Sequence, residues 1–366
     1  MRIVEIITKS EPVGGAQMVL FNLVSYLKKE HEIYVIVGDE GRLSKDLERI
    51  GVDCIILSSL KREISPLNDI KAYRGLKKIL KELKPDIVAT HSSKAGYLGR
   101  LVCSKLKISN IFTVHGWAFT SGVPFMKRSI YLMLEKLVGL YTDHIITVSD
   151  FDRKLGLKYK IVKSTQIETI HNGTPDFRND NNPKNNGQFR AVMVARFQDQ
   201  KDHLTLFKAL KRLKHLPVVV DLIGDGPRQK EFEILARKWE IENKVNFLGS
   251  KDDVAPFLNG SDIFLLISNY EGLPLSICEA MSCALPIIAS DVGGVNEMIN
   301  EGGNGYLIPK GNDELLSDKL SYLISSPELV HRMGLESRKT FEEKFSIQQM
   351  VSATNKYYRK VYESNK

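Results

Sequence analysis

The feature that most constrains the fold of this chain is an alternation of short apolar runs with amphipathic segments. The apolar runs of the first half are rich in valine and isoleucine and have the length of buried strands. They cover residues 3–7, 33–37, 54–57, 87–89, 111–114 and 145–148. Strand-like runs that alternate with helical patterns are typical of βαβ units, in which helices cover both faces of a parallel sheet. The first half therefore predicts an α/β domain built around a parallel sheet.

The same alternation begins again in the second half. Between the two halves, residues 175–188 contain too few apolar side chains to pack, which favours a linker. A length of 366 residues also fits two domains of about 150 to 200 residues each. We therefore predict two Rossmann-like domains, residues 1–170 and 171–353. The apolar runs of the second half cover residues 191–195, 218–223, 245–248, 263–267 and 286–289.

Two cations, Arg196 and Lys201, stand in the polar loop that follows the apolar run 191–195. The carboxyl end of a strand is where an open α/β sheet binds its ligands. Arginine supplies forked donors and lysine a compact charge, and the two together suit a diphosphate. Cations of an ordinary solvated loop are the alternative. We interpret the pair as a diphosphate site that needs no metal.

Two carboxylates, Glu271 and Glu279, flank the start of a predicted helix. Glu271 precedes the turn Gly272-Leu273-Pro274, and Glu279 falls two turns into the helix that follows. The neighbours of Glu279 along the helix are apolar, and a buried carboxylate needs partners, which ribose hydroxyls would supply. A helix cap and a surface carboxylate are the alternatives. Cations, carboxylates and a helix amino terminus together indicate a nucleotide-sugar site.

Two positions of the first half add candidate site residues. Gly14 and Gly15 follow the first apolar run and open an amphipathic helix, whose free amide groups attract a phosphate. A plain tight turn is the alternative. His115 ends the fifth apolar run, at the edge of the sheet where substrates bind, and we expect it to position the sugar or the acceptor. A structural histidine is the alternative.

Two further motifs have weaker functional interpretations. Asp150-Phe151-Asp152 has the form of a metal-binding motif, but it follows Ser149 at the start of a predicted helix, which favours helix capping. We expect no metal site there. Gly224 stands in the turn 223–227, and we expect it to border the nucleotide.

In order and spacing, four short motifs of this chain resemble those of glycosyltransferase family 4. The motifs are Gly14-Gly15-Ala16-Gln17, Thr113-Val114-His115-Gly116, His171-Asn172-Gly173 and Asp291-Val292-Gly293-Gly294. The resemblance spans nearly the whole chain. It implies the GT-B fold, in which two Rossmann-like domains with parallel sheets face each other across a cleft. Residues 345–365 are amphipathic and are predicted to be helical. The resemblance implies that this terminal helix, at residues 354–366, packs back on the first domain.

The resemblance also implies roles for the candidate residues. Arg196 and Lys201 contact the diphosphate, Glu271 contacts the transferred sugar, Glu279 contacts the ribose, and His115 lies beside the reacting sugar. The family retains the anomeric configuration, and we favour a front-face substitution in which the departing phosphate takes the acceptor's proton. No cofactor is expected beyond the nucleotide-sugar co-substrate. The backbone that holds the sugar is that of Gly272, Leu273 and Leu275, next to Pro274, which has no amide hydrogen.

The expected reaction is transfer of a sugar from a nucleotide sugar, with UDP favoured. The expected acceptor is a glycan or a polyprenyl-diphosphate-linked sugar in the assembly of a bacterial capsule, exopolysaccharide or O-antigen. A nucleotide-sugar epimerase of the same fold and a non-catalytic two-lobed sugar-binding protein are the alternatives. A dehydrogenase is disfavoured because no GxGxxG motif follows the first apolar run.

Charge and hydropathy indicate where the protein is expected to reside. No apolar stretch approaches the roughly 20 residues that span a bilayer, and no cleavage signal is seen at the amino terminus, so we expect a cytoplasmic protein. Residues 1–170 carry a balance of +9 and residues 171–366 a balance of −1, within a net charge of +8. The basic half, with amphipathic segments at 71–84 and 126–141, favours peripheral contact with an anionic membrane. Nucleic acid is not an expected partner.

Overall fold

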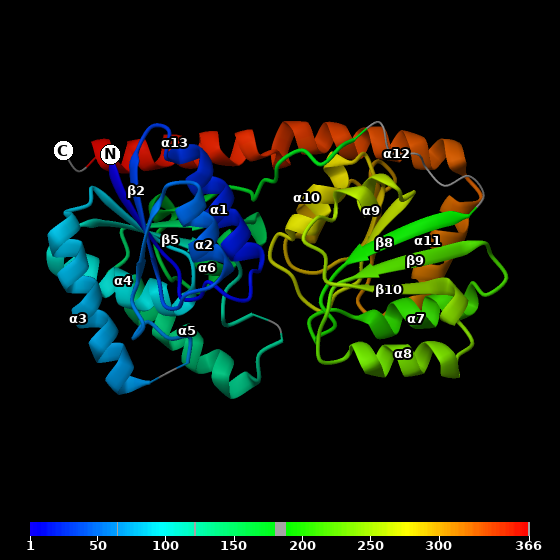
Figure 1. The fold of residues 1–366 in the computed structure, drawn as a ribbon, viewed down its shortest axis with the longest axis horizontal. Helices are drawn as coiled ribbons and strands as arrows, with labels where there is room; N and C mark the ends of the chain where they lie inside the picture. The colour runs from blue at the N-terminus through cyan, green and yellow to red at the C-terminus, as the bar shows by residue number, and fades with distance from the viewer. Residues whose placement is uncertain (64, 121, 180–187, 365–366) are drawn as a thin grey trace. The chain divides into compact units, whose positions relative to one another are not determined.

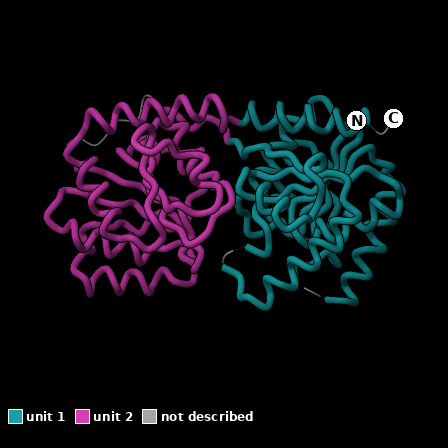
Figure 2. The backbone as a smooth tube through the Cα atoms, turned by 180° about the vertical axis from the view of Figure 1, so that it is seen from behind, with its two compact units in different colours: residues 1–173, 347–366 teal, residues 174–346 magenta. Residues whose placement is uncertain are grey.

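The computed structural model describes residues 1–63, 65–120, 122–179 and 188–364. The chain forms two compact units, shown in teal and magenta in Figure 2. Unit 1 comprises Met1–Gly173 and the returning segment Ile347–Lys366, and unit 2 comprises Thr174–Ser346. The boundaries expected from the sequence were 170/171 and 353/354. Each unit is described by itself below.

A parallel seven-stranded sheet forms the centre of unit 1, with the strand order β3-β2-β1-β4-β5-β6-β7. Valine and isoleucine side chains of these strands are buried on both faces, as expected for a parallel sheet covered by helices. β7 was not predicted, because Ile167 is its one buried residue and no apolar run marks it. The strands are β1 Arg2–Ile6, β2 Glu32–Val37, β3 Asp53–Ile56, β4 Ile87–Thr90, β5 Ser109–Val114, β6 His144–Thr147 and β7 Ile167–Thr169.

Helices cover the sheet of unit 1 (Figure 1). In one hydrophobic core, apolar side chains of β1, β2 and β4 pack against the helices at Pro66–Leu83 and Ser93–Leu106. The helices are α1 Gly15–Leu27, α2 Arg42–Arg49, α3 Pro66–Leu83, α4 Ser93–Leu106, α5 Phe125–Gly139, α6 Asp150–Lys158 and α13 Ile347–Glu363, with the short turn η1 Ser164–Gln166. No helix within the described ranges is both long and apolar enough to cross a bilayer.

The last helix, α13, packs against α1 in unit 1 (Figure 1). Its buried face includes Tyr357, Tyr358 and Val361. The helix begins at Ile347, two residues after the start of the amphipathic pattern predicted at 345–365, and earlier than residue 354, from which packing on this unit was expected. Ser346 has an extended backbone, and this break, which separates α13 from the preceding turn, sets its first residue.

A second parallel sheet forms the centre of unit 2, with six strands in the order β10-β9-β8-β11-β12-β13. β13, which follows a glycine-rich turn, was not predicted. The strands are β8 Phe189–Val194, β9 Val218–Ile223, β10 Val245–Gly249, β11 Ile263–Leu266, β12 Ile287–Ser290 and β13 Gly305–Ile308. The helices are α7 His203–Arg212, α8 Gln229–Lys238, α9 Ala255–Asn259, α10 Leu275–Ser282, α11 Asp313–Ile324 and α12 Pro327–Thr340, with the short turns η2 Glu242–Lys244, η3 Val295–Glu297 and η4 Phe341–Phe345.

Part of the predicted linker, residues 175–188, contacts unit 2. Its first residues pack on unit 2, where Asp176 pairs with Arg338 at 2.6 Å and the amide of Phe177 donates to Ser282 Oγ at 3.1 Å. Polar contacts hold these first residues, and the absence of an apolar pattern gave no signal for them. Residues 180–187 lie outside the described residues.

Candidate active site

The loop of Arg196 and Lys201 follows β8 and is tied to the ends of two neighbouring strands. The amide of Phe197 donates to the carbonyl of Asp225 at 2.8 Å, and the amide of Asp202 donates to that of Ile267 at 2.9 Å. Asp202 also caps α7, where its carboxylate accepts from the amide of Thr205. Because these bonds fix the loop, its two cations are held at the carboxyl edge of the sheet.

Lys201 and Glu271 form an ion pair. Lys201 Nζ lies 2.5 Å from Glu271 Oε1, and the two side chains are only 12% and 6% exposed. Gln200 Nε2 donates to the other carboxylate oxygen at 3.2 Å and to the carbonyl of Tyr270 at 3.1 Å. The sequence assigned the cation and the carboxylate to different parts of a ligand, and the structure brings them into contact. Gln200 was not predicted as a site residue, although its position directly before Lys201 in the sequence could have indicated it.

Two glycines let the loops of this edge approach one another. Gly224 has φ +144°, and a Cβ there would lie 2.2 Å from the carbonyl oxygen of Ala195. Gly293 has φ +61°, and a Cβ there would lie 2.0 Å from the carbonyl oxygen of Glu271. Any side chain at either position would push two loops apart. The Gly293-Gly294 motif thus supports the backbone that carries Glu271.

The turn between Glu271 and Leu275 leads directly into α10. Leu273 and Leu275 are buried, whereas Gly272 and Pro274 are half-buried. The carbonyl of Gly272 accepts the amide of Gly294 at 2.9 Å, which fixes the turn. The first amide groups of an α-helix have no partner within the helix. Such amide groups, with the helix dipole behind them, favour negatively charged or hydroxyl oxygens.

Glu279 lies on the second turn of α10 and is half-buried. Burial raises the pKa of its carboxyl to about 7. The carboxylate is therefore poorly solvated before any ligand binds, as the apolar neighbours in the sequence indicated. Hydrogen-bond donors of a ligand would stabilise its charged form.

Gly14 and Gly15 lie at the start of α1 in unit 1. Gly14 is the N-cap with φ −131°, a conformation open to any residue. A Cβ at Gly15 would meet no heavy atom within 4 Å among the described residues. Gln17 fixes the preceding loop by accepting from the amide of Gly14 and donating to the carbonyl of Lys9, both at 3.2 Å. The glycines therefore leave the start of the helix open. Backbone strain does not explain why glycine occupies these two positions.

His115 directly follows β5 and is half-buried. Its Nε2 lies 3.2 Å from Nδ1 of His91, whose own Nε2 lies 2.6 Å from Oε2 of Glu5. Burial, reinforced by His91, lowers the pKa of His115 to about 3, so the ring is neutral. His91 and Glu5 were not predicted. The signal for Glu5 was a charged residue within the apolar run 3–7.

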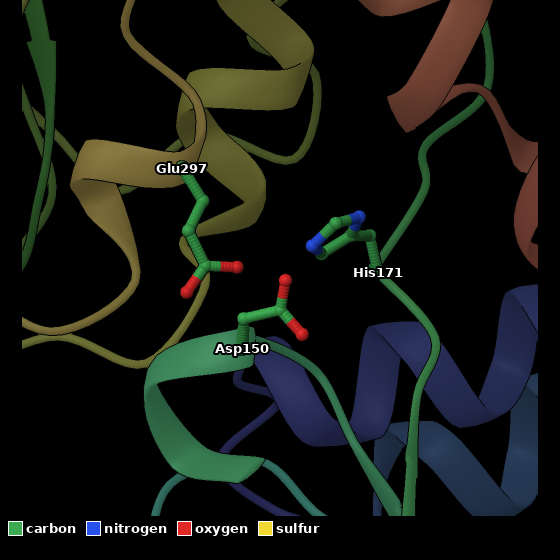
Figure 3. Close-up of side chains that lie close together, drawn as sticks. All are labelled: Asp150, His171 and Glu297. Atoms are coloured by element: carbon green, nitrogen blue, oxygen red, sulfur yellow. The ribbon is translucent and has the colours of Figure 1, made fainter. Parts of the chain in front are cut away.

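The Asp150-Phe151-Asp152 motif caps a helix, as the sequence indicated. Ser149 is the N-cap of α6, where its Oγ accepts from the amide of Asp152 at 3.1 Å and donates to the Asp152 carboxylate at 2.8 Å. A carboxylate oxygen of Asp150 and a ring nitrogen of His171 lie within 4.8 Å of each other in unit 1 (Figure 3). Glu297, also drawn in Figure 3, belongs to η3 of unit 2.

The candidate residues thus fall into two groups. Those of the second half lie at the carboxyl edge of the unit 2 sheet, where the loops after β8, β9 and β11 meet. His115 and the start of α1 lie at the carboxyl edge of the unit 1 sheet. Both placements follow from the parallel order of the strands, which brings their carboxyl ends to one edge of each sheet.

Comparisons with known proteins show which family this chain matches. Residues 13–176 match the model of Glycosyltransferase Family 4, and residues 176–340 match that of Glycosyl transferases group 1. The chain is 31% identical to the O-antigen biosynthesis glycosyltransferase WbnH of Escherichia coli over 310 residues, which cover 85% of this chain and 86% of that protein.

Two further comparisons extend over almost the whole chain. The UDP-Gal:alpha-D-GlcNAc-diphosphoundecaprenol alpha-1,3-galactosyltransferase of E. coli is 28% identical over 364 residues, covering 94% of each chain. Among solved structures, HepE of Anabaena in complex with UDP superposes with a TM-score of 0.85 at 18% identity, covering 98% of this chain and 100% of that one.

Proposed function

The chain belongs to glycosyltransferase family 4 and is a glycosyltransferase of the GT-B fold, and we propose the reaction that it catalyses. It transfers a sugar from a UDP-linked donor to a polyprenyl-diphosphate-linked sugar, with retention of the anomeric configuration, in the assembly of a bacterial surface polysaccharide. The observation that carries the proposal is the nearly buried Lys201–Glu271 pair at the carboxyl edge of the unit 2 sheet.

The donor binds at this edge of unit 2. Arg196 and Lys201 contact the diphosphate, because fixed positive charge is needed where negative charge builds up. Glu271 accepts hydrogen bonds from the transferred sugar, and Glu279 accepts them from the ribose. The first amide groups of α10 hold the sugar through the backbone at residues 272–275.

The chemical step is a front-face substitution. The bond between the anomeric carbon and the diphosphate oxygen breaks, and the acceptor oxygen bonds to the anomeric carbon on the same face. The acceptor's proton passes to an oxygen of the departing diphosphate, so that charge and protons balance. His115 lies beside the reacting sugar and positions it or the acceptor. Gly14 and Gly15 leave the start of α1 open to a phosphate of the substrates.

Names of similar proteins support the choice of substrates. The E. coli galactosyltransferase is named for a UDP-sugar donor and a diphosphoundecaprenol-linked acceptor. The Anabaena structure contains UDP. UDP as the nucleotide and a polyprenyl-diphosphate acceptor are therefore the substrates to test first.

The experiment is a transfer assay with the purified protein. Nucleotide sugars bearing UDP or GDP are each combined with a polyprenyl-diphosphate-linked sugar, with and without chelator, and nucleotide release and labelled lipid are followed. We expect lipid labelling from a UDP-sugar that persists in chelator. Conversion of the nucleotide sugar without any acceptor would instead indicate an epimerase. Failure of every nucleotide sugar to bind would contradict the assignment of the donor site.

The raised pKa of Glu279 predicts pH-dependent donor binding. If ribose hydroxyls bind the carboxylate, only the charged form binds well, so the affinity should rise about tenfold between pH 6 and pH 8. A UDP-sugar is the ligand to use, because its diphosphate does not titrate in this range. Glu279→Gln should bind more weakly and without this rise. Titration calorimetry at several pH values measures both.

The same shift has a consequence for the free protein. The folded state holds the Glu279 proton more tightly than the unfolded chain does. Its contribution to the free energy of unfolding is therefore full below pH 4.5, the ordinary pKa, and is lost as the pH rises through about 7.

The affinity for the UDP-sugar decides the role of Glu279. If the wild-type affinity stays constant from pH 6 to pH 8, the assignment of ribose binding to Glu279 is contradicted.

A surface of unit 1 fits the predicted membrane contact. We define the α5 face as the apolar side chains on the outer side of this helix. They are 49% to 80% exposed, and their spacing of three and four residues places them on one stripe. Lys127 and Lys136, both exposed, lie at its two margins. The α5 face consists of Met126, Ile130, Met133, Leu137 and Leu140.

We propose that the α5 face docks on an anionic bilayer, where the acceptor's lipid resides. An apolar stripe with lysines on both sides can insert among acyl chains while its ammonium groups remain at lipid headgroups. The net positive charge of residues 1–170 favours the same partner. A second copy of the chain is the competing occupant, and the test below separates the two.

Wild-type protein is expected to float with vesicles that contain phosphatidylglycerol and much less with pure phosphatidylcholine. Met133→Glu combined with Leu137→Glu should abolish flotation, whereas Ile234→Glu, at an exposed position of α8 in unit 2, should not. Light scattering on the same proteins measures the oligomeric state. A wild-type dimer that the α5 variant dissociates, or unchanged flotation of that variant, would contradict membrane docking.

A further inference from the structure

A chain of hydrogen bonds runs from His115 into the core of unit 1. His115 Nε2 contacts His91 Nδ1 at 3.2 Å, and His91 Nε2 contacts Glu5 Oε2 at 2.6 Å. The hydroxyl of Tyr358, from α13, donates to Glu5 Oε1 at 3.2 Å. Glu5, His91 and Tyr358 are at most 2% exposed, whereas His115 is half-buried. Elements far apart in the sequence therefore meet behind His115.

Burial of Glu5 limits where the protons of this chain can lie. A buried carboxylate is costly unless a proton or a positive charge accompanies it. Tyr358 donates a hydrogen bond but keeps its proton, since burial raises the pKa of its hydroxyl well above the usual value. Charge balances when one proton is shared between Glu5 Oε2 and His91 Nε2, and His91 keeps its other hydrogen on Nδ1.

We propose that Glu5 and His91 are positioning residues that set the tautomer of His115. His91 donates its Nδ1 hydrogen to Nε2 of His115, so His115 carries its own hydrogen on Nδ1. In this state His115 is a hydrogen-bond donor to an oxygen of the bound sugar or acceptor, and it does not act as a base. The inference rests on the proposed function, which places His115 beside the reacting sugar.

Two properties of His115 agree with a donor role. Its lowered pKa, about 3, keeps the ring neutral at physiological pH, so that it holds a single hydrogen whose place the neighbour decides. A neutral donor also suits the front-face substitution, in which the departing diphosphate takes the acceptor's proton. Tyr358 completes the chain, so a residue of the returning helix α13 contributes to the position of Glu5.

The tautomer is measured directly in the folded wild-type protein. Histidine labelled with 15N gives long-range 1H–15N NMR correlations that distinguish a protonated from an unprotonated ring nitrogen, and His115→Gln identifies the signals of His115. We expect hydrogen on Nδ1 and none on Nε2. Hydrogen on Nε2, or a doubly protonated ring, overturns the inference. The measurement needs no turnover, so its outcome is separate from that of the proposed reaction.

Two substitutions of His91 test the positioning role. Asparagine keeps an N–H donor near the place of Nδ1, whereas leucine keeps none. We expect His91→Leu to lower kcat for transfer about tenfold, the effect of one lost hydrogen bond, with the affinity for nucleotide sugar unchanged. His91→Asn should recover most of this loss.

The control is Glu32→Gln, which changes an exposed carboxylate on β2 of the same sheet. It should leave kcat unchanged. Melting curves establish that each variant is folded. Equal losses of kcat in the two His91 variants, or no loss in either, would overturn the positioning role. If His91→Leu does not fold, the tautomer in the wild type still decides the inference.

Discussion

Lys201→Ala is expected to lower kcat for sugar transfer by about 10²–10³-fold, and Glu271→Ala by a similar factor. The two side chains contact each other at 2.5 Å and are almost excluded from water. In the proposed reaction, the ammonium group stabilises the negative charge that develops on the diphosphate as the glycosidic bond breaks. That interaction is strong because little water screens it. Initial rates of nucleotide release and lipid labelling at saturating donor measure the loss.

Removal of one partner also leaves the other charge poorly compensated, so stability must be measured beside activity. The variant Lys201→Met combined with Glu271→Leu removes both charges and separates the two effects. It should melt near the wild-type temperature and remain inactive. Lys214→Ala is the matched control, because this lysine of unit 2 forms an exposed pair with Glu240. Wild-type rates in a well-folded Lys201→Ala protein would contradict the assigned role.

Glu135→Ala is expected to lower the free energy of unfolding of unit 1 by about 3–5 kcal/mol. Glu135 pairs with Arg100 at 2.9 Å, and the two side chains are 1% and 0% exposed. The guanidinium also donates to the carbonyl of Gly96 and to Thr142 Oγ1, and it lies 4.3 Å from the ring centroid of Phe112. Loss of the carboxylate leaves a buried positive charge between α4 and α5. Chemical denaturation followed by circular dichroism measures the change.

A double substitution distinguishes charge from packing at this site. Arg100→Met combined with Glu135→Leu removes both charges and retains side-chain volume, so it should recover much of the stability lost in Glu135→Ala. Glu30→Ala, which breaks an exposed pair with Arg359, is the control and should have no measurable effect. If Glu135→Ala unfolds at the wild-type denaturant concentration, the buried pair does not stabilise unit 1.

Much of the fold was predictable because its signals are local. Buried parallel strands read as valine-rich and isoleucine-rich runs, and the cap at Ser149 depends on residues within one helical turn. β7 and β13 were not predicted. β7 has a single buried side chain, and β13 is a short strand that pairs only at the edge of its sheet. The amphipathic pattern 345–365 predicted the last helix but not the break at Ser346, which sets its first residue.

The candidate site shows the same division. Arg196, Lys201, Glu271 and Glu279 were predicted as site residues from residue types at strand ends and around one helix start. Their contacts were not, because Lys201 and Glu271 are 70 residues apart and meet only when β8 pairs with β11. The support of His115 by His91 and Glu5 likewise depends on β1 lying beside β4.

The alternation of strands and helices, the parallel sheets and the residue types at the edge of each sheet could all be predicted from the amino-acid sequence. These follow from periodicity and turn chemistry, which involve neighbours in the chain. The pairing of Lys201 with Glu271 and the buried carboxylate behind His115 became visible only in the folded chain. Such contacts depend on the order in which strands pair and on the burial that results, and no local pattern specifies either.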